Sequence, residues 1–262
     1  MTVAGAREIV DVHAHIGTTV SSGVGQTVDE WLQTMDRVGI ATSVLSVAAG
    51  GAQSRGLDDT RHANDVLAAA CRDHPGRFLA ALGSVEVRHG EAGIVEVSRV
   101  MDELAFAGLA FHATFEGFSV DSSAFDAVLA ALGDREAVIL VHCTADAKAS
   151  PAAIALVAKR YPRLRFVLGH PVFTPAQRED AIEQLRTTAN LWLDIAYQDS
   201  PQTTTEFVHA LGADRVLFGS DAPFFDPARV IASIEAADIS DAEREAILGG
   251  NARRLFSGLN QA

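Results

Sequence analysis

Eight short apolar runs recur along the chain, and the interval between neighbouring runs is long enough for a helix. The runs are residues 9–16, 42–48, 78–86, 108–113, 138–144, 165–171, 190–197 and 215–221. Parallel strands need a connection of helical length, so this alternation predicts a parallel sheet covered by helices. Eight such units in 262 residues predict an α/β fold of the (β/α)8 type, the TIM barrel.

The segments between the runs carry signals for the start and end of helices. Thr27 and Glu30 form a capping-box pattern, and Gly39 is the expected end of that helix. Later helices are expected where a capping residue precedes a proline, at 150–151, 174–175, 200–201 and 226–227. Ser240 and Glu243 predict an additional helix near the C-terminus. No low-complexity linker interrupts the chain, so residues 1–262 are expected to form a single domain.

Composition excludes several classes of partner. No apolar run reaches the roughly 18 residues of a membrane helix, so we expect no membrane partner. A formal net charge of −13 would repel a phosphate backbone, which argues against nucleic acid. Cys71 and Cys143 have neither metal-binding nor redox spacing, and the N-terminus lacks a signal-peptide pattern. The expected location is therefore the cytoplasm.

Four histidines and one aspartate lie at the ends of predicted strands. His13 and His15 are two residues apart, so their side chains point to the same side, with Cα atoms about 6.5–7 Å apart. His142, His170 and Asp221 come late in "VILVHCTAD", "RFVLGHPV" and "RVLFGSDAPF". The carboxyl ends of barrel strands share one face, so these five side chains are expected to converge.

A shared divalent cation explains this convergence. Burying several imidazoles and a carboxylate without a common partner is costly, whereas a cation uses their lone pairs and compensates the charge. Zinc accepts such ligands, with Zn–N distances of about 2.0–2.1 Å. The alternative, two hydrogen-bonded histidines at a strand end, would account for His13 and His15 but not for the other three residues.

The motifs "DVHAH", "VHC", "GHP" and "GSDAPF", taken in order, resemble the amidohydrolase superfamily. Within it they resemble the amidohydrolase-related (amidohydrolase 2) family, which includes aminocarboxymuconate-semialdehyde decarboxylase. The resemblance extends along nearly the whole chain, to "ILGGNARRLF" near the C-terminus. It implies a metal bound by His13, His15, His142 and Asp221. It also implies that His170 lies beside the metal and contacts substrate or activated water.

The same resemblance bears on the number of ions. Many binuclear members of the superfamily use a carbamylated lysine on the fourth strand, where this chain reads "GLAFHAT". One divalent ion is therefore expected. We expect Zn²⁺, and Mn²⁺ also fits, because both accept nitrogen and oxygen donors. Related enzymes are often homodimers.

Other residues are candidates for contacts around the ion. His112, in "GLAFHAT", points into the pocket or outward to a helix, and we expect substrate contact. Arg55 could bind a substrate carboxylate or be a solvated loop charge. Asp11 could orient a metal ligand or make a structural hydrogen bond. Five phenylalanines near strand ends could line an aromatic slot or serve as packing, namely Phe115, Phe118, Phe173, Phe224 and Phe225.

These residues support three functional hypotheses for a small-molecule substrate. The first is a metal-dependent hydrolase that cleaves an amide, lactone or other carboxyl derivative with metal-activated water, using Asp221 and His170 as acid–base groups. The alternative is non-oxidative decarboxylation of an aromatic or unsaturated acid at the same site. The third is an inactive binding protein on the same barrel, disfavoured because all five positions carry competent residues.

Overall fold

The computed structural model describes residues 8–19, 22–48 and 56–259, and each of the eight expected runs contains a strand. One sheet has the order β2-β1-β3-β4-β5-β6-β7-β8-β9. The strands are β1 (Ile9–Thr18), β2 (Gly25–Gln26), β3 (Ile40–Val47), β4 (Phe78–Gly83), β5 (Gly108–Phe111), β6 (Val138–His142), β7 (Arg165–Gly169), β8 (Leu191–Asp194) and β9 (Val216–Leu217). All neighbouring pairs are parallel except β1 with β2, a short hairpin that the sequence did not predict.

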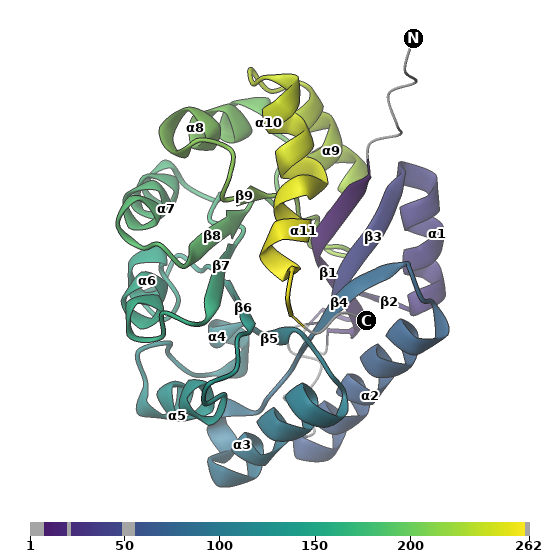
Figure 1. Ribbon diagram of the computed structural model, residues 1–262, viewed down its shortest axis with the longest axis vertical. Coiled ribbons are helices and arrows are strands. Elements are labelled where there is room, and N and C mark those ends of the chain that lie inside the picture. The colour runs from purple at the N-terminus through teal and green to yellow at the C-terminus, as the bar shows by residue number, and fades with distance from the viewer. Residues whose placement is uncertain (1–7, 20–21, 49–55, 260–262) are drawn as a thin grey trace.

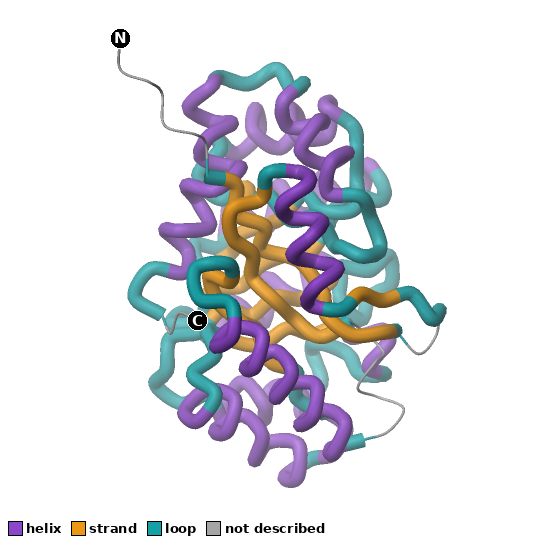
Figure 2. The backbone as a smooth tube through the Cα atoms, turned by 90° about the vertical axis from the view of Figure 1, so that its right-hand side faces the viewer, coloured by secondary structure: helices purple, strands orange, loops and turns teal. Residues whose placement is uncertain are grey.

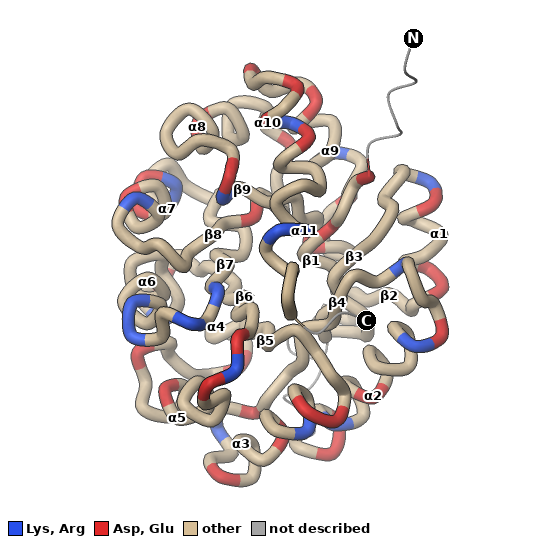
Figure 3. Tube along the Cα trace, viewed as in Figure 1, with Lys and Arg blue, Asp and Glu red and all other residues tan. Residues whose placement is uncertain are grey.

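Helices surround the strands (Figure 1), and the side view shows the strands enclosed by them (Figure 2). The α-helices are α1 (Val28–Val38), α2 (Leu57–Asp73), α3 (Glu91–Ser98), α4 (Ala113–Glu116), α5 (Ser123–Ala131), α6 (Pro151–Arg160), α7 (Pro175–Thr187), α8 (Pro201–Leu211), α9 (Pro227–Glu235), α10 (Asp241–Glu245) and α11 (Asn251–Phe256). The remaining helical turns are η1 (Val87–His89), η2 (Arg99–Glu103) and η3 (Ala246–Gly250). Charged residues lie mostly on the surrounding helices and loops (Figure 3).

Backbone hydrogen bonds between the first strand and the segment after the last strand close the sheet. The N–H of His15 donates to the carbonyl of Ala222 at 2.8 Å, and the N–H of Asp221 donates to the carbonyl of His13 at 2.7 Å. Ala14 and Ala222 are paired in parallel between these bonds. The expected (β/α)8 barrel is therefore confirmed.

Several strands end before the apolar runs that predicted them. Strand β5 ends at Phe111, and β7 ends at Gly169. Of the residues that follow, Ala113, His170 and Pro171 are buried, and His112 is half-buried. His170, directly after β7, and Asp221, after β9, have left-handed φ values of 40° and 63°. Hydrophobic periodicity reports burial, so it does not detect where the strand hydrogen bonding stops.

Most helix boundaries follow the predicted capping residues. Thr27 and Glu30 form the expected capping box, and α1 ends at Gly39, whose φ of 79° favours glycine. The side chains of Ser150, Thr174 and Asp226 each accept a backbone N–H at the start of a helix. Ser200 precedes α8 as predicted, but its hydroxyl donates to Gln202 instead of capping the helix.

The C-terminal helical segment closes the amino-terminal end of the barrel. Side chains of α11, including Leu255 and Phe256, pack in one cluster with barrel residues such as Val12 and Leu140. Figure 1 shows α11 crossing in front of the strands. No helix in the described ranges combines the length and the apolar character needed to cross a membrane.

Asn251 connects this segment to the last strand. Its Nδ2 donates to the carbonyls of Ala213 at 2.7 Å and Val216 at 2.6 Å, and the side chain is buried. We expect Asn251→Ala to lower the free energy of unfolding by about 2–4 kcal/mol, because two buried carbonyls lose the hydrogen bond from the Asn251 amide. Urea denaturation measures this change.

Asn251→Asp should destabilise the protein at least as much, since a carboxylate would face the two carbonyl oxygens without donating to them. The exposed Gln202→Ala serves as the control, with an expected change within about 0.5 kcal/mol. An Asn251→Ala protein as stable as the control variant would contradict this role.

Candidate active site

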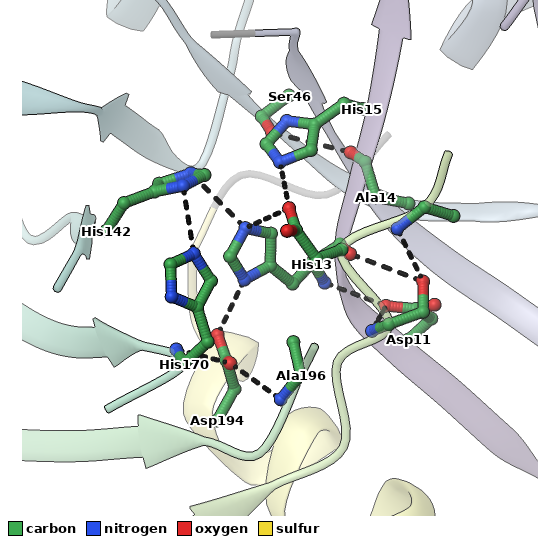
Figure 4. A network of polar contacts seen from close by, with 12 residues as sticks. Asp11, His13, Ala14, His15, Ser46, His142, His170, Asp194 and Ala196 are labelled. Carbon is green, nitrogen blue, oxygen red and sulfur yellow. Dashed lines mark hydrogen bonds and ion pairs between the residues drawn. The ribbon is translucent and has the colours of Figure 1, made fainter. Parts of the chain in front are cut away.

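The four predicted ligand residues meet at the carboxyl-terminal mouth of the barrel. His13 and His15 come from β1, His142 is the last residue of β6, and Asp221 follows β9. All four are buried, and one ligand atom from each lies within 4.8 Å of the others. Figure 4 shows the rings of His13, His15 and His142 pointing toward one another. These residues could hold a metal ion.

The distances define which atoms face the centre. His13 Nε2 lies 3.2 Å from His142 Nε2 and 3.4 Å from Asp221 Oδ1. His15 Nε2 lies 2.9 Å from the same carboxylate oxygen. Three Nε2 atoms and one carboxylate oxygen therefore surround a common point. A cation bound at that point would replace the direct contacts among these four atoms.

Hydrogen bonds on the outer side of two rings select the tautomer that a metal requires. Asp194 is 2.8 Å from His13 Nδ1, and since a carboxylate only accepts, the neutral ring carries its proton on Nδ1. His15 Nδ1 lies 3.2 Å from the carbonyl of Val47 and 2.8 Å from Ser46 Oγ. The Nε2 lone pairs of both rings are therefore directed at the centre.

Sequence reasoning missed Asp194, although the signal that found the other residues was present. It is the last residue of β8, in "LWLD", at the same end of the barrel. Its Oδ1 also accepts the backbone N–H groups of His170 at 2.9 Å and Ala196 at 3.1 Å. Asp11, the residue considered for orienting a ligand, accepts the backbone N–H of His13 and contacts no imidazole nitrogen in the described structure.

A glycine on the neighbouring strand end makes room for the His13 ring. A Cβ atom at Gly219 would lie 2.7 Å from His13 Cβ and 3.3 Å from the Asp194 carboxyl carbon. The first distance is shorter than real Cβ contacts allow. The glycine in "LFGSD" is therefore required by close approach, and it lets the dyad of His13 and Asp194 lie against the barrel wall.

The site keeps Asp194 and Asp221 ionised and His142 and His170 neutral. Burial acts to raise the pKa of Asp221, but the hydrogen bond from His15 and nearby imidazoles lower it to about 2. Burial and the surrounding imidazoles hold the pKa of His142 well below its usual value. Burial also lowers the pKa of His170. Neutral imidazoles beside ionised carboxylates are the forms that bind a divalent cation.

The pKa of His13 is shifted in the opposite direction to those of His142 and His170. Burial acts against its charged form, but three neighbouring carboxylates, led by Asp194, outweigh burial and raise its pKa to about 9. Without a metal, a proton therefore supplies part of the positive charge that the carboxylates require. A divalent cation would take over this role and displace the proton.

A pocket of about 320 Å³ opens above these residues. His142, His170 and Asp221 line it, together with Thr19 and Ser22. The other lining residues are His112, Phe115, Phe173, Tyr197 and Phe224.

The predicted phenylalanines divide between wall and core. Phe118 packs against Phe111 and Phe125 in the core, whereas Phe225 lies beside Tyr197 with ring centroids 5.3 Å apart. Tyr197 was not predicted, because no polar motif marks it. Arg55 lies outside the described residues.

This barrel, with side chains at its mouth that could hold a metal ion, indicates the class of the protein. A family model described as amidohydrolase matches residues 10–258, and the chain therefore belongs to the amidohydrolase family. The resemblance expected from the motifs is confirmed.

The comparisons also identify particular similar proteins. Gamma-resorcylate decarboxylase from Rhizobium sp. (strain MTP-10005) is 26% identical over 292 residues, covering 87% of this chain and 86% of the relative. Because this aligned length exceeds the 262 residues here, the relative carries segments that this chain lacks. The structure of 2,6-dihydroxybenzoate decarboxylase in complex with 2,6-dihydroxybenzoate has a TM-score of 0.76 and 21% identity, covering 95% of this chain and 99% of that chain.

A third similar protein is dihydroxybenzoic acid decarboxylase from Polaromonas sp. JS666, solved with manganese and 2-nitroresorcinol. Its TM-score is 0.72 at 20% identity, and the match covers 95% of this chain and 97% of that chain.

The expectation of a hydrolase is wrong, because the curated relatives are decarboxylases. The findings favour the alternative that shares the metal site. The physical reason for the error is that His13, His15, His142 and Asp221 suit both reactions. A cation with an acid–base group activates water or holds a carboxylic acid equally well, so the ligand motifs do not separate hydrolysis from decarboxylation.

Replacing Asp194 tests its control over the His13 tautomer. In Asp194→Asn, one oxygen can still accept the two backbone N–H groups, but the amide NH₂ then faces His13 Nδ1. That contact favours a proton on Nε2, where a metal would bind. We expect the dissociation constant for zinc to rise about 10–100-fold, measured by competition with a chelator.

The exposed Asp199→Asn on the following loop is the matched control, since Asp199 pairs only with Arg229 among the described residues. Equal zinc affinities of the two variants would contradict the role assigned to Asp194.

The pH dependence of metal binding follows from the raised pKa of His13. Below pH 9 the metal-free ring is protonated, and this proton must leave before Nε2 can bind a cation. Zinc affinity should therefore fall about tenfold for each pH unit below about 9. Calorimetry in buffers of different ionisation enthalpy counts the released proton.

In Asp194→Asn, zinc affinity should stop rising with pH at a lower pH than in the native protein. The reason is that the carboxylate that raises the His13 pKa is gone. An affinity that does not change between pH 7 and 9, with no proton released, would show that His13 is not protonated in the metal-free protein.

Proposed function

We propose that the protein is a metal-dependent, non-oxidative decarboxylase of a hydroxylated aromatic carboxylic acid. The observation that carries this proposal is a buried ligand cluster at the base of a pocket whose walls are largely aromatic. Its decarboxylase relatives support the same reaction. An aromatic ring fits a pocket with phenyl walls, and the cluster provides a site for its carboxylate.

His13, His15, His142 and Asp221 would hold one divalent cation. The neutral nitrogen donors with a single carboxylate suit zinc, and they suit manganese as well. Zinc was our expectation, and the manganese in the Polaromonas neighbour makes Mn²⁺ an equal candidate for testing. When bound, the cation supplies positive charge that holds an anionic substrate oxygen and stabilises charge that develops as the carbon–carbon bond breaks.

Asp221 and His170 are the groups proposed to handle the proton. The net reaction replaces a carboxylate by hydrogen, so it consumes one proton and releases carbon dioxide. Asp221 lines the pocket with its carboxylate ionised, so it can accept a proton and return it to the ring carbon. His170 Nδ1 is buried without a hydrogen-bond partner, and this nitrogen can stabilise a substrate oxygen.

The remaining walls orient the substrate ring. Phe173 and Tyr197 lie on one side, with ring centroids 5.6 Å apart, and Phe173 also contacts His170 at 5.1 Å. None of the described residues that line the pocket is Lys or Arg. The carboxylate would therefore rely on the cation and on Arg55. We still propose Arg55 and His112 as substrate contacts.

The test is an assay for carbon dioxide release with 2,6-dihydroxybenzoate, using protein loaded with zinc or manganese. Asp221→Asn and His170→Asn should each lower kcat by about 10²–10⁴-fold, the usual contribution of a proton-transfer group. His209→Asn is the control, because His209 is exposed and bonds only the carbonyl of Asp238 in the described chain.

Metal-loaded protein that releases no carbon dioxide from hydroxybenzoic acids, or that releases it equally after Asp221→Asn, would overturn the proposal. Chelation should abolish the activity, and adding back either metal should restore it.

Two further expectations stay proposals. The two cysteines are free and buried, which fits the reducing cytoplasm that we propose as the location. The homodimer implied by the family is tested by light scattering on the purified chain.

A further inference from the structure

His112, the residue that follows strand β5, is held by two hydrogen bonds, one to its ring and one from its backbone. His112 precedes the short helix α4, and its Nδ1 accepts the backbone N–H of Phe115 at 3.3 Å. The backbone N–H of His112 itself donates to Glu116 Oε1 at 2.8 Å. The arrangement resembles a capping box in which an imidazole replaces the usual hydroxyl.

The hydrogen bond from the backbone N–H of Phe115 determines the tautomer of His112. A nitrogen that accepts an N–H carries a lone pair, so the neutral ring has its proton on Nε2. The ring is also stacked on Phe115, with ring centroids 4.0 Å apart and an angle of 22° between the ring planes. Both the plane of the ring and the position of its proton are therefore set by the protein.

The other end of the ring faces the pocket. His112 lines it, its ring centroid is 4.9 Å from that of His142, and no described residue bonds its Nε2. An N–H without a protein partner at this place is available to a substrate. Because it donates only, it fits an acceptor oxygen and not another donor.

Glu116 lies in surroundings that favour its uncharged form. Burial raises its pKa to about 8, the backbone N–H of His112 acts in the opposite direction, and nearby Glu86 raises it further while Arg88 lowers it. Charged or neutral, one carboxyl oxygen can accept the N–H of His112. A glutamine side chain would do the same, which supplies a conservative replacement.

We propose that Glu116 is a positioning residue that holds His112 as a neutral hydrogen-bond donor to a ring oxygen of the substrate. This inference rests on the proposed function. It makes the pair of His112 and Glu116 a determinant of specificity. The pair would favour aromatic acids with ring oxygens on both sides of the carboxylate over acids that lack one of these oxygens.

The first experiment reads the tautomer and needs no activity. Long-range ¹H–¹⁵N spectra of the zinc-loaded full chain with ¹⁵N-labelled histidine distinguish protonated from unprotonated ring nitrogens. The His112 signals are assigned by their loss in His112→Asn. We expect Nε2 protonated in the native protein and in Glu116→Gln, and a mixture of tautomers in Glu116→Ala. A proton on Nδ1 in the native protein, or an unchanged spectrum in Glu116→Ala, would overturn the proposal.

The second experiment compares 2,6-dihydroxybenzoate with 2-hydroxybenzoate, which lacks one ring oxygen. The ratio of their kcat/KM values should fall about tenfold in Glu116→Ala and stay unchanged in Glu116→Gln. Glu243→Ala is the matched control, because Glu243 accepts the backbone N–H of Ser240 in the capping box of α10. It should leave the ratio unchanged.

The two proposals can fail separately. If neither acid loses carbon dioxide, the proposed function fails, and the tautomer spectra still decide whether Glu116 positions His112. If both acids react but Glu116→Ala keeps the native ratio, decarboxylation stands and the role of Glu116 in specificity is wrong.

Discussion

The site depends on the hydrogen bonds that join strand β1 to the segment following β9. The carbonyl of His13 accepts the N–H of Asp221, and the N–H of His15 donates to Ala222. These two bonds place residues from opposite ends of the chain against each other while the barrel closes. The left-handed φ of Asp221 then turns its carboxylate toward the imidazoles. A sheet left open between β9 and β1 would separate the aspartate from the histidines.

Electrostatics explains why such a cluster can be buried. Asp194 and Asp221 keep their negative charges because imidazoles and backbone N–H groups stabilise them. A cation would complete the balance, and the outer contacts of His13 and His15 leave suitable lone pairs for it. The same principle extends to His112, where contacts with Phe115 and Glu116 select the opposite tautomer and present a proton. Ring nitrogens around one pocket thus serve different purposes according to what binds their other side.

The distinction between hydrolysis and decarboxylation lies outside the ligand set. Phe115, Phe173, Tyr197 and Phe224 come from the segments after four different strands, and together they make a pocket suited to a flat ring. The sequence left open whether the three phenylalanines line a slot or pack in the core, and no pattern marked Tyr197. That is why the ligand motifs identified the superfamily but favoured the wrong reaction.

The sequence by itself determined the barrel and the ligand candidates. Apolar runs alternating with capped helices predict parallel strands, and parallel strands of a barrel end on one face. The sequence therefore predicts that four side chains lie close together, because each is at a strand end, namely His13, His15, His142 and Asp221. His170 could be added by the same rule.

Only the tertiary structure decided how those side chains are oriented and what surrounds them. Asp194 contacts His13 across 181 positions of sequence, and Gly219 is needed because His13 packs against it. Tautomers, pKa values and pocket walls depend on such contacts between distant segments. A linear pattern records which residues are polar or apolar, and it contains no information on which partner faces each nitrogen.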